Sequence, residues 1–172
     1  MRYLTVVRHA KAVPAPAGGP DVDRPLAARG RDQCATLRAW ATDPSALGAY
    51  GPAMALVSAA ARTRETFERA FDGTPFILGY QLSSLIYNGA RDVTAEDVLI
   101  ELAAIDPVTS SLLVVAHNPT VHELVLTLAL RAPKELRNGR YPLAGAYVLA
   151  LADDRPIGLG RLEVVDRYLP LD

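Results

Sequence analysis

The chain contains four short apolar runs with the composition of buried β-strands, at residues 3–7, 54–57, 112–116 and 147–151. Three of the four are almost continuously apolar rather than alternating, which is the pattern of strands covered on both faces. A fifth strand is expected at residues 160–165, paired with the strand at 147–151 across a turn at 153–156. The pattern therefore predicts a central sheet with both faces buried.

Apolar residues three or four positions apart predict helices between these strands. This spacing covers residues 34–41, 66–71, 98–102 and 121–128. The last helix follows Asn118 and Pro119, and asparagine is a good N-cap while proline suits the first turn. Because strands and helices alternate over most of the chain, we predict an α/β fold with a mostly parallel sheet and an antiparallel edge. Residues 1–172 are expected to form one domain, since the sequence shows no linker and no second core.

Composition and charge exclude several classes of protein. Of the 172 residues, 50% are hydrophobic and 22% are charged, which is unlike a disordered chain. Eighteen basic and nineteen acidic residues give a formal net charge of -1, so binding to nucleic acid through bulk charge is not expected. The single cysteine, Cys34, excludes an internal disulfide and a multi-cysteine zinc site. No stretch reads as a membrane span or a secretory signal, so the expected location is the cytoplasm.

Arginine and histidine residues follow three of the predicted strands. Arg8 and His9 come directly after the first strand, Arg62 comes shortly after the second, and His117 and Asn118 follow the strand at 112–116. In an open α/β sheet, ligands bind outside the carboxyl ends of the strands. The helix that starts near Pro119 adds free backbone amides, which favour an anion. The sequence therefore predicts an anion-binding site at this end of the sheet.

These side chains suit phosphoryl transfer. The fork of donors on an arginine matches phosphate oxygens, and a neutral imidazole can attack phosphorus to form a phosphohistidine. A second imidazole, when protonated, can stabilise charge on the equatorial oxygens. This scheme requires no metal and no cofactor. A zinc site made of two histidines and a carboxylate stays an alternative.

Each residue also has an ordinary structural interpretation. A single arginine at a strand end is usually solvated or ion-paired, and a single histidine there usually packs or caps. Lys11 fits a surface charge, and His122 fits a helix residue beside apolar positions. The placement of Arg-His, Arg and His at three successive strand ends favours a common site over independent accidents.

Three motifs resemble those of the histidine phosphatase superfamily, and most closely its small SixA-type phosphohistidine phosphatases. The motifs are Arg8-His9-Ala10-Lys11-Ala12, the segment from Ser58 through Arg62 to Thr66, and Ala116-His117-Asn118-Pro119-Thr120. The segment from Asp23 to Leu26, followed by Arg29-Gly30, is similar to the one that opens the first helix in that branch. Together the motifs extend from residue 2 to about residue 151, in the order of the family.

The resemblance implies a fold and a set of roles. The fold is a three-layer α/β/α sandwich of the phosphoglycerate-mutase-like type. His9 is the nucleophile that becomes phosphorylated, while Arg8, Arg62 and His117 hold the phosphoryl oxygens. The backbone amide of Asn118 is a further candidate for binding the substrate.

The chain departs from the family in its general acid. Many phosphomonoesterases of the superfamily use a glutamate between the second arginine and the second histidine, whereas residues 80–89 contain no carboxylate. General acid catalysis is typically worth about 10²–10⁴-fold, and an imidazole leaves with less need of a proton than an alkoxide does. The departure favours phosphohistidine or aryl phosphates as substrates. Asp21 or Asp23, in the loop after the nucleophile, could replace the glutamate.

The most favoured function is therefore a metal-independent phosphatase that acts on protein phosphohistidine through a phosphorylated His9. Residues 73–111 leave room for one strand, a loop and one helix, so we expect no lid over the pocket. Two alternatives stay open: a phosphatase of small molecules such as sugar, nucleotide or aryl phosphates, and a non-catalytic module that binds phosphorylated ligands. The expected partner is a phosphorylated protein or a small phosphorylated substrate, with no nucleic acid and no membrane. The sequence does not indicate the oligomeric state.

Overall fold

The computed structural model describes residues 1–15, 17–89, 91–105, 111–151, 157–158 and 161–170. The strands are β1 (Arg2–Arg8), β2 (Ala53–Ser58), β3 (Ile77–Ser83), β4 (Ser111–Ala116), β5 (Ala146–Leu151) and β6 (Val164–Tyr168). The α-helices are α1 (Ala28–Thr42), α2 (Ala61–Ala70), α3 (Ala95–Ile105), α4 (Thr120–Leu128) and α5 (Lys134–Arg137). Two short 3-10 helices, η1 (Asp21–Asp23) and η2 (Leu47–Tyr50), lie in the connections on either side of α1.

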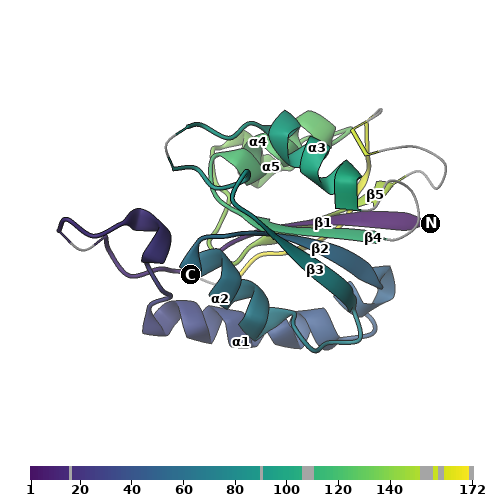
Figure 1. The fold of residues 1–172 in the computed structure, drawn as a ribbon. Helices are drawn as coiled ribbons and strands as arrows, with labels where there is room; N and C mark the ends of the chain where they lie inside the picture. Colours follow the sequence, from purple (N-terminus) through teal and green to yellow (C-terminus); the bar gives the residue numbers. More distant parts are fainter. Residues whose placement is uncertain (16, 90, 106–110, 152–156, 159–160, 171–172) are drawn as a thin grey trace.

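The six strands form one mixed sheet in the order β3-β2-β4-β1-β5-β6. The pairs β2–β3, β2–β4 and β1–β4 are parallel, whereas β5 is antiparallel to both β1 and β6. Helices α1 and α2 lie on one face of the sheet, and α3, α4 and α5 lie on the other (Figure 1). The molecule is thus a three-layer α/β/α sandwich with a mostly parallel sheet and an antiparallel edge, as the sequence predicted.

The central strand β4 shows why the apolar runs form strands at these positions. All six of its residues are buried, and successive side chains point to opposite faces of the sheet. Leu112 and Val114 pack in the core beneath α3 and α4, while Leu113 and Val115 pack in the core beneath α1 and α2. Burial on both faces requires an unbroken apolar run, which is the pattern found in the sequence.

Three expectations about local structure need correction or completion. The last strand is Val164–Tyr168 rather than 160–165, although it does pair with β5 as predicted. Residue 160 and the expected turn at 153–156 lie outside the described residues. Asn118 does not cap α4, because Pro119 holds the N-cap position and no side chain makes a capping hydrogen bond there.

Candidate active site

The register of the sheet brings the two motif histidines together. Arg8 is paired with Ala116 on the neighbouring parallel strands β1 and β4, so His9 and His117 both follow matched positions. The backbone amide of His9 donates to the carbonyl of Ala116 at 3.1 Å. The centres of the two imidazole rings are consequently 5.2 Å apart.

The second arginine reaches the same place from α2. Strand β2 lies on the other side of β4, and Arg62 stands in the first turn of α2, just after β2 ends. That first turn is tied to the loop after His9, because the hydroxyl of Thr66 accepts from the amide of Ala10 at 3.0 Å and donates to the carbonyl of Arg62 at 2.6 Å. The four predicted residues therefore meet at the carboxyl ends of β1, β4 and β2.

These residues line a cavity of about 340 Å³, which we call the catalytic cavity. It is strongly basic, and no aspartate or glutamate is among the described residues that line it. The lining consists of Arg8, His9, Lys11, Ala12, Arg24, Arg62, Asn88, His117, Asn118 and Leu143. The predicted substrate-binding residue Asn118 is thus in the cavity with the other four.

His9 is held in the orientation that a nucleophile requires. Its Nδ1 atom lies 2.7 Å from the backbone carbonyl oxygen of Ala10. A carbonyl can only accept, so Nδ1 carries the proton and Nε2 keeps its lone pair. Burial, together with the positive charges of Arg62, Arg8 and Arg24, lowers the pKa of His9 from 6.5 to about 4. At neutral pH the imidazole is therefore uncharged, and its Nε2 has a lone pair that can attack phosphorus.

His117 is held by Ser58, at the end of β2. The Ser58 Oγ and His117 Nε2 atoms are 2.7 Å apart, and both side chains are buried. Burial, followed by the proximity of His9 and Arg62, lowers the pKa of His117 to about 2. His117 is consequently uncharged at neutral pH, whereas the scheme predicted from the sequence uses its protonated form. If the Ser58 hydroxyl donates to Nε2, the Nδ1 atom carries a proton that it can donate to a phosphoryl oxygen.

Four buried polar atoms of residues that line this cavity have neither a hydrogen-bond nor an ion-pair partner among the described residues. They are Arg8 Nε, Arg62 Nε, His117 Nδ1 and Asn118 Oδ1. Buried polar groups are normally satisfied, so unpaired polar atoms on several residues of one cavity indicate the place of a polar ligand. The two arginine atoms are donors, and donors select an anion with oxygen acceptors.

Comparison by sequence finds no match for the chain, either among protein-family models or among curated proteins. Solved structures do match it. A candidate phosphohistidine phosphatase SixA from Nakamurella multipartitia has a TM-score of 0.77 and 24% identity, over 99% of this chain and 97% of that one. Another, from Agrobacterium tumefaciens, has a TM-score of 0.75 and 25% identity, over 98% and 99%. A protein histidine phosphatase SixA complexed with tungstate has a TM-score of 0.71 and 19% identity, over 96% and 95%.

The chain has the fold of the histidine phosphatase superfamily. This fold, which is phosphoglycerate-mutase-like, is the one that the three sequence motifs predicted. Within the described part of the chain, no group of three or more His, Cys, Asp or Glu side chains is placed to hold a metal ion. No helix in that part is long and apolar enough to cross a membrane.

Asp21 lies beside the catalytic cavity, but in a poor environment for a proton donor. Its carboxylate accepts from Arg62 Nη2 at 3.0 Å and from the Tyr87 hydroxyl at 2.8 Å, and it pairs with Arg24 Nε at 2.7 Å. Burial raises the pKa of Asp21, but the hydrogen bond from Tyr87 and the charges of Arg62 and Arg24 outweigh this and lower it overall. A carboxyl group held in its ionised form is an unsuitable general acid. Asp23, the other candidate, is exposed in η1 and does not line the catalytic cavity.

Sequence reasoning missed several side chains that complete the site. Ser58 and Arg24 belong to the family-like motifs, but the sequence predicts no role for them. Lys11, which the sequence presents as a surface charge, lines the cavity. Tyr87 and Asn88 come from the connection between β3 and α3. The ring of Tyr87 lies edge-on to His117 with ring centres 5.6 Å apart, and Arg62 lies over its face at 5.8 Å from the ring centre. The segment at residues 80–89, which contains no carboxylate, thus supplies a tyrosine and an amide to the site.

His122 lies away from this site, as its sequence context indicated. Its Nε2 donates to the carbonyl of Leu136 at 2.9 Å, which ties α4 to α5. The connection between β3 and α3, in which the sequence predicts no lid, contributes Asn88 to the wall of the catalytic cavity.

Proposed function

We propose that the protein is a metal-independent phosphatase that acts through a phosphorylated His9 and prefers phosphohistidine on a protein as its substrate. One observation carries the proposal. The unprotonated Nε2 of His9 stands in a cavity with Arg8, Arg62 and His117, and no described carboxylate lines that cavity. The match to the fold of SixA phosphohistidine phosphatases supports the same substrate class.

The reaction has two steps. In the first, the Nε2 lone pair of His9 forms a bond to phosphorus while the phosphorus–nitrogen bond of the substrate breaks. The departing ring keeps the electron pair of that bond and, with a proton on its other nitrogen, leaves as neutral imidazole. In the second step water attacks phosphorus, the bond to Nε2 breaks, and its electron pair returns to His9. Phosphate and a proton are released.

The cations of the site stabilise both steps. Arg8 and Arg62 donate to the phosphoryl oxygens, on which negative charge is spread in the transition state. With the Ser58 hydroxyl donating to Nε2, His117 adds a neutral donor through Nδ1, and the negative charge of the phosphoryl group raises the low pKa of His117. Because these charges come from the protein, the transfer needs no metal ion.

The preferred leaving group follows from the absence of a carboxylate among the described residues that line the catalytic cavity. An alkoxide needs a proton as it leaves, and a site without an acid loses the associated factor of about 10²–10⁴. A ring that departs as neutral imidazole has no such need, and an aryl oxide has less need than an alkoxide. The site therefore favours phosphohistidine over aryl phosphates, and aryl phosphates over alkyl phosphates.

A substrate panel tests this proposal. We expect kcat/KM for a phosphohistidine peptide to exceed that for glycerol phosphate by roughly 100-fold, with para-nitrophenyl phosphate in between. His9→Ala should lose turnover of all three, while His122→Gln serves as a control outside the cavity. A preference for glycerol phosphate would instead favour a small-molecule phosphatase. Binding of phosphate without turnover of any substrate would favour a non-catalytic module.

A further inference from the structure

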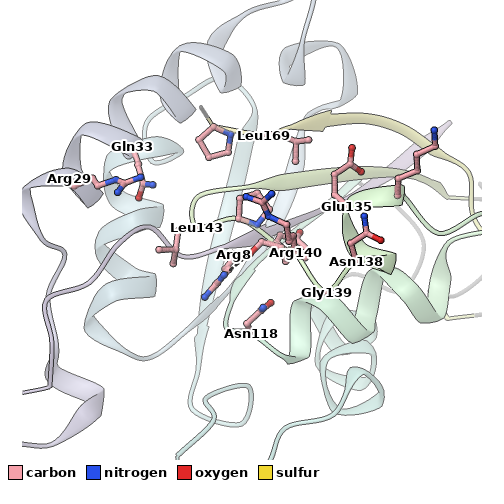
Figure 2. Close-up of a pocket in the computed structure, with 14 residues that line it drawn as sticks. Arg8, Arg29, Gln33, Asn118, Glu135, Asn138, Gly139, Arg140, Leu143 and Leu169 are labelled. Carbon is pink, nitrogen blue, oxygen red and sulfur yellow. Dashed lines mark hydrogen bonds between the residues drawn. The ribbon is translucent and has the colours of Figure 1, made fainter. Parts of the chain in front are cut away.

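A large open hollow adjoins the catalytic cavity. It has a volume of about 520 Å³, and the two share Arg8, Asn118 and Leu143 as lining residues. Arg29 and Gln33 reach toward it from α1 on one side, while Asn138 and Arg140 lie on the other (Figure 2). We call this hollow the basic groove.

The groove continues away from the site along α1. A further hollow of about 500 Å³ shares Arg29, Gln33, Leu169 and Pro170 with it. The three spaces follow one another from the catalytic cavity outward. The three adjoining spaces offer more room than one phosphorylated side chain requires, so they suit an extended segment of polypeptide.

The lining of the basic groove carries an excess of positive charge. This lining holds one acidic side chain, Glu135, which is itself paired with Arg167 at 3.1 Å, and four basic ones, Arg8, Arg29, Lys134 and Arg140. Arg29 and Lys134 are exposed and form no ion pair with any described residue. The whole chain has a net charge of only -1, so this positive surface is a local feature. A surface of one sign next to a reaction site attracts partners of the opposite sign.

We infer that the basic groove binds an acidic segment of polypeptide that flanks the phosphorylated side chain of the substrate protein. This inference rests on the proposed phosphatase function. The phosphoryl group occupies the catalytic cavity, and acidic residues beside it reach Arg29 and Lys134. Leu143, Leu169 and Pro170 supply apolar contacts for the stems of those residues. The groove thus selects among phosphorylated proteins by their charge, while the catalytic cavity recognises the phosphoryl group.

Two phosphohistidine peptides of equal length test the inference, one flanked by Asp and Glu and the other by Asn and Gln. We expect the protein to prefer the acidic peptide by about tenfold in kcat/KM, and to lose this preference as salt is added. The double variant Arg29→Glu with Lys134→Glu should lower kcat/KM for the acidic peptide by about tenfold, mainly through KM. Turnover of the neutral peptide and of para-nitrophenyl phosphate should be unchanged in this variant. Arg64→Glu, on the exposed side of α2 and outside the groove, is the matched control.

Equal kcat/KM for the two peptides would overturn the inference, and so would an equal loss for both in the double variant. A preference for a nucleoside monophosphate over both peptides, lost in the same variant, would assign the groove to a small ligand. If the protein turns over none of these substrates, the proposed function fails. Equilibrium binding of a fluorescein-labelled acidic peptide, with and without the double substitution, then still decides whether the groove binds such a segment.

Discussion

Burial next to arginines controls the protonation of both imidazoles in the site. It lowers the pKa of His9 to about 4 and that of His117 to about 2, against 6.5 for an ordinary histidine. Nitrogen-15 NMR of labelled histidines should therefore show both rings neutral at pH 5.5, with the His9 proton on Nδ1. His122 provides a reference signal from outside the site. An imidazolium signal for His9 at pH 6 would contradict this account of the nucleophile.

The same shifts make the stability of the fold depend on pH. Between about pH 6.5 and pH 4 the unfolded chain binds protons at these two histidines, whereas the folded chain leaves them neutral. As the pH falls, the unfolded state is stabilised relative to the folded state because it binds more protons. The free energy of unfolding therefore decreases as the pH drops through this window. Denaturant unfolding at pH 7 and pH 5 measures the change. A double variant with glutamine at both positions should show a smaller decrease.

We expect Ser58 to be a positioning residue that acts on the substrate through His117. Its hydroxyl, 2.7 Å from Nε2, fixes which ring nitrogen of His117 faces the phosphoryl group with a proton. Ser58→Ala should lower kcat by roughly tenfold, in keeping with one buried hydrogen bond. The NMR signals of His117 should also show a mixture of tautomers, which a purely structural role for Ser58 would not produce. Ser84→Ala, at an exposed position, is the control. An unchanged tautomer in Ser58→Ala would contradict this role.

A substitution at Asp21 distinguishes an orienting role of this carboxylate from general acid catalysis. The carboxylate holds Arg62 Nη2 at 3.0 Å, and its pKa is lowered rather than raised. Asp21→Asn should therefore keep kcat for glycerol phosphate, whose alkoxide leaving group needs a proton, within about fivefold of the unsubstituted protein, since no proton transfer is removed. A loss of about 10²-fold or more would identify Asp21 as the general acid.

At the scale of the elements, the start of α1 is packed against the loop that follows His9. A Cβ atom on Gly30 would lie 2.1 Å from the backbone oxygen of Lys11. The same oxygen accepts from the amide of Ala27 at 2.9 Å. Only a glycine permits this approach, so Gly30 fixes how α1 lies behind the site.

Gly30→Ala should consequently be destabilising. Forcing α1 away from Lys11 should cost about 1–3 kcal/mol, as overpacking generally does, and thermal unfolding would register this as a lower Tm. Gly79→Ala is a suitable control, because its added Cβ would meet only the flexible side chain of Met54 at 3.4 Å. Equal Tm values for the two variants would show that α1 does not require this contact.

The elements that the sequence predicts well are those buried on both faces. The observed β1 and β2 extend the predicted apolar runs by one residue at each end, and β4 and β5 extend theirs by one residue at the start. Strand β3 lies at an edge of the sheet, and its Leu78, Tyr80 and Leu82 are exposed, so it has no continuous apolar run to mark its limits. Strand β6 lies at the opposite edge and alternates between half-buried and exposed residues, which explains the shift in its predicted position.

At the scale of the whole molecule, the topology explains which site residues could be predicted. Arg8 ends β1, and His9 and His117 directly follow β1 and β4, which are neighbours in the parallel part of the sheet. Arg62 stands in the first turn of the helix after β2, which pairs with β4 on its other side. Ser58, Tyr87 and Asn88 reach the site through side-chain contacts and a loop, which no periodicity in the sequence encodes. The net charge of -1 likewise gives no sign of the local excess of arginine and lysine around the cavity and the basic groove.

The central claim is that the phosphoryl group passes through His9. The most direct measurement is to mix the protein with a phosphohistidine peptide labelled on phosphorus, quench within one turnover in base, and locate the label by mass spectrometry. We predict base-stable, acid-labile label on His9, with none in His9→Ala and unchanged labelling in His122→Gln. Full turnover by His9→Ala, or label located on any other residue, would contradict the account.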